Sequence, residues 1–264
     1  MGFSKLNYKV KNGIAIVQMN CLKNLNAVDE KMASDLIDAM KEAESDPDVK
    51  VVVLSSAAKS FSAGGDIGFF NDQLKAGQDM DLSTLFYLVG VLADYMKKMS
   101  KPIISSVNGA AAGAGVGLAL GADFMICADN AKFILAFVNL GLVPDTGSTY
   151  LLAKNIGVNR TMEIVSSGRP FSAQEAKDLG LACKVVPAEC LEKETMIYAE
   201  RLASGPLKSY KNIKKQIYNA VFDEYREWLS DIELPTQQEC SVTQDFKEGC
   251  MAFAEKRAAK FSGN

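Results

Sequence analysis

The sequence predicts an α/β protein in which parallel strands alternate with helices, followed by a helical C-terminal third. Two observations support this prediction. Short runs of β-branched and other apolar residues recur at 51–54, 103–107 and 124–128, as expected for strands buried on both faces. Segments with apolar residues at helical spacing separate these runs. Strands separated by helices indicate βαβ units with right-handed crossovers.

The elements are predicted in order along the chain. Residues 9–19 predict an opening hairpin around Gly13. Asn26, with Asp29 in the first turn, predicts the N-cap of a helix that ends before Pro47. After the strand at 51–54, residues 61–66 predict a glycine turn and residues 82–99 a helix. A second strand is predicted at 103–107, a small-residue turn with a helix at 109–121, and a third strand at 124–128. Beyond about Pro187 almost every segment has a helical pattern.

The composition restricts the chemistry that the chain can perform. Among its 264 residues there is no histidine. A Ser-His-Asp or Cys-His nucleophile pair is therefore impossible, and imidazole-ligated metals are excluded. Acid–base catalysis must depend on carboxylates, lysines, tyrosines, cysteines or backbone groups.

The charge balance and the cysteines point to a cytoplasmic protein. A net charge of −3 argues against nucleic acid as a partner. The six cysteines form no CxxC or other metal-like pairing, so no metal site is expected. The N-terminus lacks the apolar stretch of a signal peptide, and the stretch at 109–122 is too short to span a bilayer. We therefore expect no membrane partner.

Two glycine-containing turns are candidates for a ligand site. The segment 109–117 fails as a dinucleotide fingerprint because Leu118 stands where the third glycine is needed, and it has no Gly-Lys-Ser/Thr. Backbone N–H groups at a helix start would suit an oxyanion or carbonyl oxygen. The alternative is that small residues only allow close helix packing. The turn at 62–66, with Asp66 as a helix cap, could aim a second donor at the same point.

Several motifs in register resemble the crotonase (enoyl-CoA hydratase/isomerase) superfamily. They lie at 61–66 (FSAGGD), 102–109, in the glycine run ending at Asp123, and at 141–149, 168–180 and 245–257. The resemblance implies a spiral of ββα units that binds acyl-CoA and catalyses its reaction (residues 1–196). It also implies a helical C-terminal oligomerisation domain (197–264) that forms a homotrimer or a dimer of trimers. An acyl-CoA thioester would be the substrate, without a separate cofactor.

The resemblance also implies the site residues. The backbone N–H groups of Ala63 and Ala114 would form the oxyanion hole for the thioester carbonyl. The remaining substrate-binding positions would surround the coenzyme A and acyl portions of the substrate: Lys23, Leu25, Ala27, Ser62, Gly64, Gly65, Asp66, Ile67, Gly113, Phe137, Leu140 and Pro144. Lys256 and Arg257 match a family motif near the coenzyme A entrance. By contrast, the lysines at 208, 211, 214 and 215 suggest a solvated helix face.

One carboxylate remains for catalysis. The two glutamate positions of the family's hydratases fall on Gly117 and Phe137, neither of which can transfer a proton. Asp145 could simply cap a helix that begins near Ser148. The resemblance instead implies a catalytic role, because single-carboxylate Δ3,Δ2-enoyl-CoA and 1,2-epoxyphenylacetyl-CoA isomerases carry an acid here. Burial beside Phe137 and Leu140 is expected to raise the pKa of Asp145.

The predicted function is therefore an acyl-CoA isomerase in which Asp145 is the single acid/base. Hydratase or another acyl-CoA lyase activity is one alternative. A catalytically inactive acyl-CoA-binding paralogue is another, and an RNA-binding relative fits the acidic balance poorly. A haloaroyl-CoA dehalogenase is disfavoured, because it would need a histidine base and a tryptophan at the position of Phe137, and the chain has neither.

Overall fold

A six-stranded sheet lies at the centre of the molecule, in a computed structural model that describes residues 2–75 and 81–264. Its strand order is β1-β2-β3-β4-β6-β9. The strands are Leu6–Lys11, Ile14–Met19, Val51–Ser56, Ile103–Val107, Phe124–Ala128 and Lys184–Val186, in that order. The first two form an antiparallel hairpin and the others pair in parallel. The predicted hairpin and all three predicted strands are thus confirmed.

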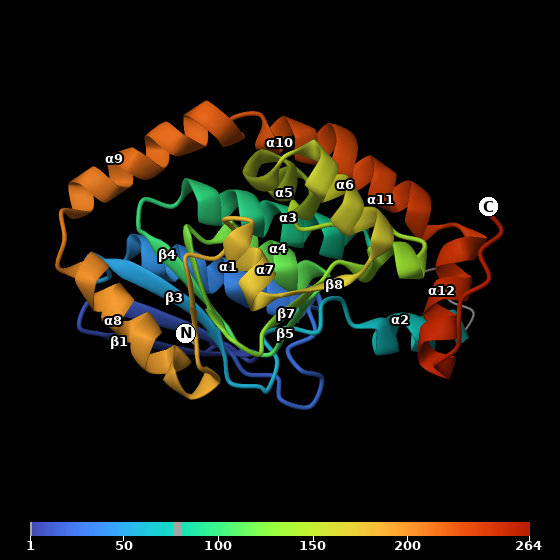
Figure 1. The fold of residues 1–264 in the computed structure, drawn as a ribbon, viewed down its shortest axis with the longest axis horizontal. Coiled ribbons are helices and arrows are strands. Elements are labelled where there is room, and N and C mark those ends of the chain that lie inside the picture. The colour runs from blue at the N-terminus through green and yellow to red at the C-terminus, as the bar shows by residue number, and fades with distance from the viewer. Residues whose placement is uncertain (1, 76–80) are drawn as a thin grey trace.

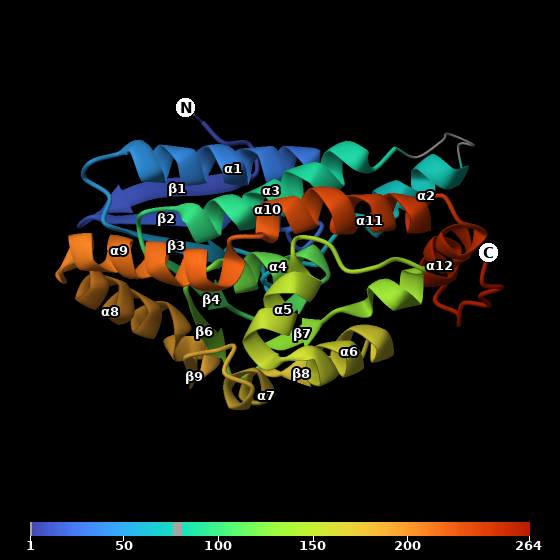
Figure 2. The same ribbon diagram turned by 90° about the horizontal axis from the view of Figure 1, so that it is seen from above.

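The central strands are covered on both faces, as their composition predicts. In β3, Val52 and Leu54 belong to the core beneath helices α1 (Glu30–Ser45) and α3 (Ser83–Lys98). Val51 and Val53 point the other way, into a second core with α8 (Leu191–Ala203). Figure 2 shows α1 and α3 on one side of the sheet and α8 on the other. This alternation arises because successive strand side chains point to opposite faces.

A second, three-stranded sheet brings the two glycine turns together. It consists of β5 (Ala110–Ala112), β7 (Lys132–Ile134) and β8 (Pro170–Ser172). Strand β5 lies in the segment predicted to be only a turn and a helix, and helix α4 (Ala114–Gly121) follows it directly. Three alanines carry no strand signature in a single sequence, and pairing with β7 makes them a strand.

Helix α1 begins three residues later than the sequence predicts. Its N-cap is Asp29, whose carboxylate accepts the Met32 N–H at 2.8 Å. Asn26 is fully buried and has a different role. Its side chain accepts the Cys21 N–H at 2.7 Å and donates to the Phe61 carbonyl at 3.2 Å. Asn26 therefore holds the loop before α1 against the first glycine turn.

The C-terminal part is helical from Ala188 onward, as the sequence predicts beyond about Pro187. The boundary predicted between residues 196 and 197 falls inside α8, which packs on the central sheet. The chain changes direction at Ser204 and Pro206. Beyond this point, helices run along the outside of the molecule (Figure 1). They are α9 (Leu207–Ile217), η3 (Tyr218–Phe222), α10 (Tyr225–Trp228), η4 (Leu229–Glu233), α11 (Leu234–Ser241) and α12 (Gln244–Glu255).

Short helices connect the strands and the longer helices. They are α2 (Ile67–Lys75), η1 (Ala136–Leu140), α5 (Ser148–Ile156), α6 (Val158–Ser167), α7 (Ala173–Asp178) and η2 (Ala188–Cys190). Helix α12 packs against both α2 and η1, so the C-terminal end of the chain returns to the glycine turns. Across residues 2–75 and 81–264, no helix has both the length and the apolar character needed to cross a membrane.

Lys214 of α9 lies in a largely buried ion pair, and the prediction that it faces solvent is wrong. Its Nζ atom is 2.7 Å from the carboxylate of Asp123. It also donates to the carbonyls of Met96 and Lys101 at 3.2 and 3.1 Å. These contacts fasten α9 to the ends of α3 and β4.

Candidate active site

A mainly apolar cavity of about 720 Å³ lies between the two glycine turns, α3, η1 and α12. Among the described residues that line it, Asp145 is the one carboxylate. Ten of the predicted site residues line it: Leu25, Ala63, Gly64, Gly65, Ile67, Gly113, Ala114, Phe137, Leu140 and Asp145. The structure therefore brings most of the candidate residues from five separate segments to one place.

The two glycine turns are in direct contact. The Ser62 N–H donates to the Ala110 carbonyl at 3.1 Å, and the Ala112 N–H donates to the Ser62 carbonyl at 2.9 Å. Gly64 has a φ of +83°, and a Cβ atom there would lie 2.7 Å from the Ala112 carbonyl oxygen. Glycine at 64 thus allows both the backbone conformation and the close approach of the turns.

Ala63, the first predicted oxyanion donor, has an acceptor within the chain itself. The N–H of Ala63 donates to the Leu25 carbonyl at 2.9 Å and is therefore already used. Two residues later, Gly65 lines the cavity, and no residue that the structure describes accepts a hydrogen bond from its N–H. Gly65 is thus the free donor of this turn.

Ala114, the second predicted donor, has the expected surroundings. It is the first residue of α4, so its N–H has no acceptor within the helix. It lines the cavity, and within the described chain no other group accepts its N–H. The N–H groups of Gly65 and Ala114, on the two contacting turns, therefore both remain available to a ligand in the cavity.

Asp145 does not cap α5. The N-cap of that helix is Gly147, and Ser148 donates its N–H to the main-chain carbonyl of Asp145. The side chain is only 8% exposed and accepts a 2.8 Å hydrogen bond from the Thr146 hydroxyl. Burial raises the pKa of Asp145 to about 6, against the opposing effect of the Thr146 hydrogen bond. A carboxylate with this pKa can take up and return a proton near neutral pH.

A second carboxyl group lies behind Asp145. Glu233 is 3% exposed and accepts the Gly147 N–H at 2.9 Å. Burial, and then the charge of Asp145, raise the pKa of Glu233 to about 8. No sequence motif marked this residue, because its role depends on a contact between the helical C-terminal part and a loop of the catalytic core.

The positions of the hydratase glutamates cannot supply carboxylates. A Cβ atom at Gly117 would lie 2.5 Å from the Thr146 Cβ atom and 2.7 Å from the Thr146 carbonyl oxygen. Phe137 is buried and places its ring against the cavity. The space next to Asp145 is therefore filled by Thr146 and an aromatic ring.

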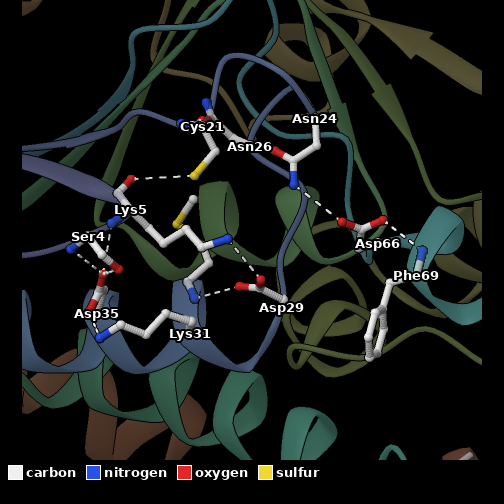
Figure 3. Close-up of polar contacts among 11 residues, drawn as sticks. Ser4, Lys5, Cys21, Asn24, Asn26, Asp29, Lys31, Asp35, Asp66 and Phe69 are labelled. Carbon is white, nitrogen blue, oxygen red and sulfur yellow. Dashed lines mark hydrogen bonds and ion pairs between the residues drawn. The ribbon is translucent and has the colours of Figure 1, made fainter.

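Five predicted substrate-binding residues do not line the cavity: Lys23, Ala27, Ser62, Asp66 and Pro144. Ala27 and Ser62 are buried, whereas Lys23 is exposed on the loop before α1. Asp66 caps α2 by accepting the Phe69 N–H at 3.1 Å, and it accepts a hydrogen bond from Asn24 at 3.3 Å (Figure 3). Of these five, Ser62 and Asp66 make hydrogen bonds that hold the first glycine turn.

Other lining residues went unrecognised in the sequence. Leu85, Phe86 and Val89 of α3 have ordinary core spacing, which does not distinguish a cavity wall from a packed core. The C-terminal segment contributes Ala252, Phe253, Arg257 and Phe261. Arg257, predicted near the entrance, is also paired with Glu248 at 2.9 Å.

Comparison with known proteins supports the resemblance to the crotonase superfamily. Residues 9–264 match the enoyl-CoA hydratase/isomerase family. The chain is 35% identical to the trans-2-decenoyl-[acyl-carrier-protein] isomerase of Streptococcus mutans over 100% of both chains. It is 35% identical to the 1,2-epoxyphenylacetyl-CoA isomerase of Escherichia coli, covering 96% of this chain and 97% of that protein.

A solved structure with the same fold is that of an enoyl-CoA hydratase from Mycobacterium avium subsp. paratuberculosis. It has a TM-score of 0.87 and 30% identity, covering 96% of this chain and all of the other. Sequence motifs, fold and relatives agree, so this chain is an enzyme of the enoyl-CoA hydratase/isomerase family, with the crotonase fold.

Proposed function

We propose that the enzyme is an isomerase that moves a carbon–carbon double bond of an enoyl thioester between the Δ3 and Δ2 positions. The observation that carries the proposal is a single buried carboxylate, Asp145, in the same apolar cavity as two free backbone donors. Allylic isomerisation needs one group that removes and returns a proton. Hydration would need a second group to activate water.

The reaction can be written with this chain's residues. Ionised Asp145 removes a proton from C2 of the 3-enoyl thioester, and the electron pair moves onto the thioester oxygen to form a dienolate. The N–H groups of Gly65 and Ala114 hydrogen-bond that oxygen. Asp145 then returns the same proton to C4 as the double bond forms between C2 and C3. The step moves no electrons to another molecule, so it requires no redox cofactor.

The raised pKa of Asp145 suits this role. A carboxylate with a pKa of about 6 is a stronger base than an ordinary aspartate and is still mostly ionised at pH 7. The apolar lining also excludes water from the dienolate. Oxyanion donors in such a site typically contribute on the order of 100-fold or more each to the rate.

The acyl group of the substrate can be carried by acyl carrier protein or by coenzyme A. The streptococcal relative is named for a decenoyl group on acyl carrier protein, and the E. coli relative for an epoxide on coenzyme A. The two thioesters share the atoms that Asp145 and the donors contact. We therefore propose an enoyl thioester substrate and include both carriers and the ring epoxide in the assay.

Substitution of Asp145 by asparagine tests the proposal. Asparagine keeps the size of the side chain but cannot act as the base, so we expect at least a ~100-fold loss of 3-enoyl-CoA or decenoyl-acyl-carrier-protein isomerisation. Asp48→Asn, at an exposed site, is the matched control and should retain wild-type rates. Full activity of Asp145→Asn would remove Asp145 from the mechanism.

Hydratase activity is the second candidate, because the Mycobacterium avium protein with the same fold is named a hydratase. The enzyme would then convert a 2-enoyl-CoA to a 3-hydroxyacyl-CoA, which loss of absorbance of the conjugated thioester would follow. We expect no such conversion because Gly117 and Phe137 replace the needed carboxylates. Tight acyl-CoA binding without turnover of any of these thioesters would instead identify an inactive binding protein.

A further inference from the structure

We propose that Glu233 is a positioning residue for Asp145, whose neutral carboxyl group holds Gly147 in place and orients Gln237 toward the base. The inference rests on the proposed function, in which Asp145 is the base. Glu233 lies at the end of the π-helical segment η4, and Gln237 follows one helical turn later in α11. Neither residue lines the cavity, so both act through Asp145.

The first contact is with the loop that carries Asp145. The Gly147 N–H lies 2.9 Å from one carboxyl oxygen of Glu233 and 3.2 Å from the other. Thr146 and Gly147 both have left-handed φ angles, +57° and +68°. A Cβ atom at Gly147 would lie 2.2 Å from the Tyr225 hydroxyl oxygen. The loop conformation is therefore held by a hydrogen bond to Glu233 and by packing against Tyr225.

The charges around Glu233 favour its neutral form. In the described parts of the chain, no lysine or arginine pairs with Glu233 or Asp145. The titratable groups that face it are Asp145 and Tyr225. Asp94 of α3 lies beyond Tyr225 and is already paired with Lys98 and Arg226. Two buried carboxyl groups without a cation do not ionise together readily, so one proton stays on the pair.

The order of ionisation identifies which group keeps the proton. The pKa of Asp145 is raised to about 6 and that of Glu233 to about 8. Asp145 also accepts the Thr146 hydroxyl, which favours its charged form, so we assign the shared proton at neutral pH to Glu233. The two groups lose their protons as a coupled pair in two steps. The step at the lower pH ionises Asp145 and so produces the active base.

Gln237 provides the second link. It is fully buried, and neither its carboxamide oxygen nor its nitrogen has a hydrogen-bond partner in the described structure. It lies close enough to Asp145 to lower the pKa of that carboxyl group. Residues four apart on a helix share one face. A protonated Glu233 can donate to the Gln237 oxygen, which leaves the Gln237 nitrogen to donate to Asp145.

The pH profile of kcat/KM tests this role, because it reports ionisations of the free enzyme. For the wild-type enzyme we expect an acid limb near pH 6 and an alkaline limb near pH 8, where Glu233 loses its proton and can no longer donate to Gln237. Activity at pH 9 should be about tenfold below its maximum. Glu233→Gln still accepts the Gly147 N–H but cannot ionise, so its profile should keep the acid limb and stay within about twofold up to pH 9.

Glu239→Gln is the matched control, since it removes the same charge from an exposed site on α11. It should reproduce the wild-type profile. An alkaline limb that persists in Glu233→Gln would overturn the inference, even if the rate were lower at every pH, because a purely structural contact would leave the shape unchanged.

Gln237→Met supplies an independent test if Glu233→Gln does not fold. Loss of the carboxamide donor should move the acid limb to higher pH and leave the alkaline limb in place; an unchanged acid limb would overturn the link through Gln237. Failure of the proposed function has a different signature, which is full activity of Asp145→Asn. An inactive Asp145→Asn together with an unaltered Glu233→Gln profile would refute only the role of Glu233.

Discussion

At the residue scale, Ala63 and Gly65 differ in whether their main-chain amides already have an acceptor within the chain. Both lie in the same turn, two positions apart, and both line the cavity. Leu25 comes from a distant loop with a left-handed φ of +55°, and its carbonyl accepts the Ala63 N–H. The amide of Gly65 has no acceptor in the described chain, which is why the proposed mechanism assigns it to the thioester oxygen.

Gly65→Pro tests this assignment, because proline has no N–H. We expect a loss of about 100- to 1000-fold in kcat of the isomerase reaction, as for removal of one oxyanion donor in other enzymes. Gly65→Ala is the control, since it keeps the N–H and its Cβ would contact only the ring of Phe70, at 3.3 Å. Equal activity of a folded Gly65→Pro variant and Gly65→Ala would exclude Gly65 as a donor.

The sequence predicted the site only as far as local motifs define it. Asp145 and Ala114 follow from motifs in register, and the structure places both on one cavity. The choice between neighbouring amides depends on Leu25, and the surroundings of Asp145 depend on Glu233 and Gln237. Such contacts join segments far apart in the chain, so neither spacing nor composition reveals them.

At the scale of single elements, the longer apolar strands of the central sheet were predictable, and the three-residue strands β5, β7, β8 and β9 were not. Strand β3 is recognisable from three valines and a leucine, whereas β5 is three alanines and exists because it pairs with β7. The start of α1 was wrong because Asn26 and Asp29 are both good caps. Only the buried contacts of Asn26 show that it is used elsewhere.

The attachment of α9 gives a prediction for one element. Lys214→Met removes the partner of Asp123 and the donor to two carbonyl groups. Because both charged side chains are mostly buried, we expect the free energy of unfolding to fall by about 1–3 kcal/mol. Lys215→Met, at the adjacent exposed site, should change it by less than about 0.5 kcal/mol.

Urea denaturation of both variants measures the difference. Equal stability of Lys214→Met and Lys215→Met would show that packing alone, without the ion pair, holds α9 in place.

At the scale of the whole molecule, the buried carboxyl pair makes stability depend on pH. Folding raises the pKa of Asp145 to about 6 and that of Glu233 to about 8. The folded state then holds protons that the unfolded chain releases at about pH 4. The stability contribution of these protons is fully present below about pH 4 and is lost as the pH rises to about 8.

Glu233→Gln should therefore be less sensitive to pH than the wild-type protein. Between pH 5 and pH 8 we expect the wild-type protein to lose about 3–4 kcal/mol more unfolding free energy than the variant, from about 1.36 kcal/mol for each pH unit over which Glu233 keeps its extra proton. Urea unfolding at pH 5, 6.5 and 8 gives the comparison without any enzyme assay. Parallel curves for the two proteins would contradict a buried, proton-binding Glu233.

The wall that α12 and residues 257–261 contribute to the cavity has a consequence for biosynthesis. Leu25 and Phe261 face the same space, yet the ribosome adds them near opposite ends of the chain. All strands of both sheets precede α12 and can pair while translation continues. We therefore expect a nascent chain to form its sheets before the C-terminal wall that encloses the cavity has been made.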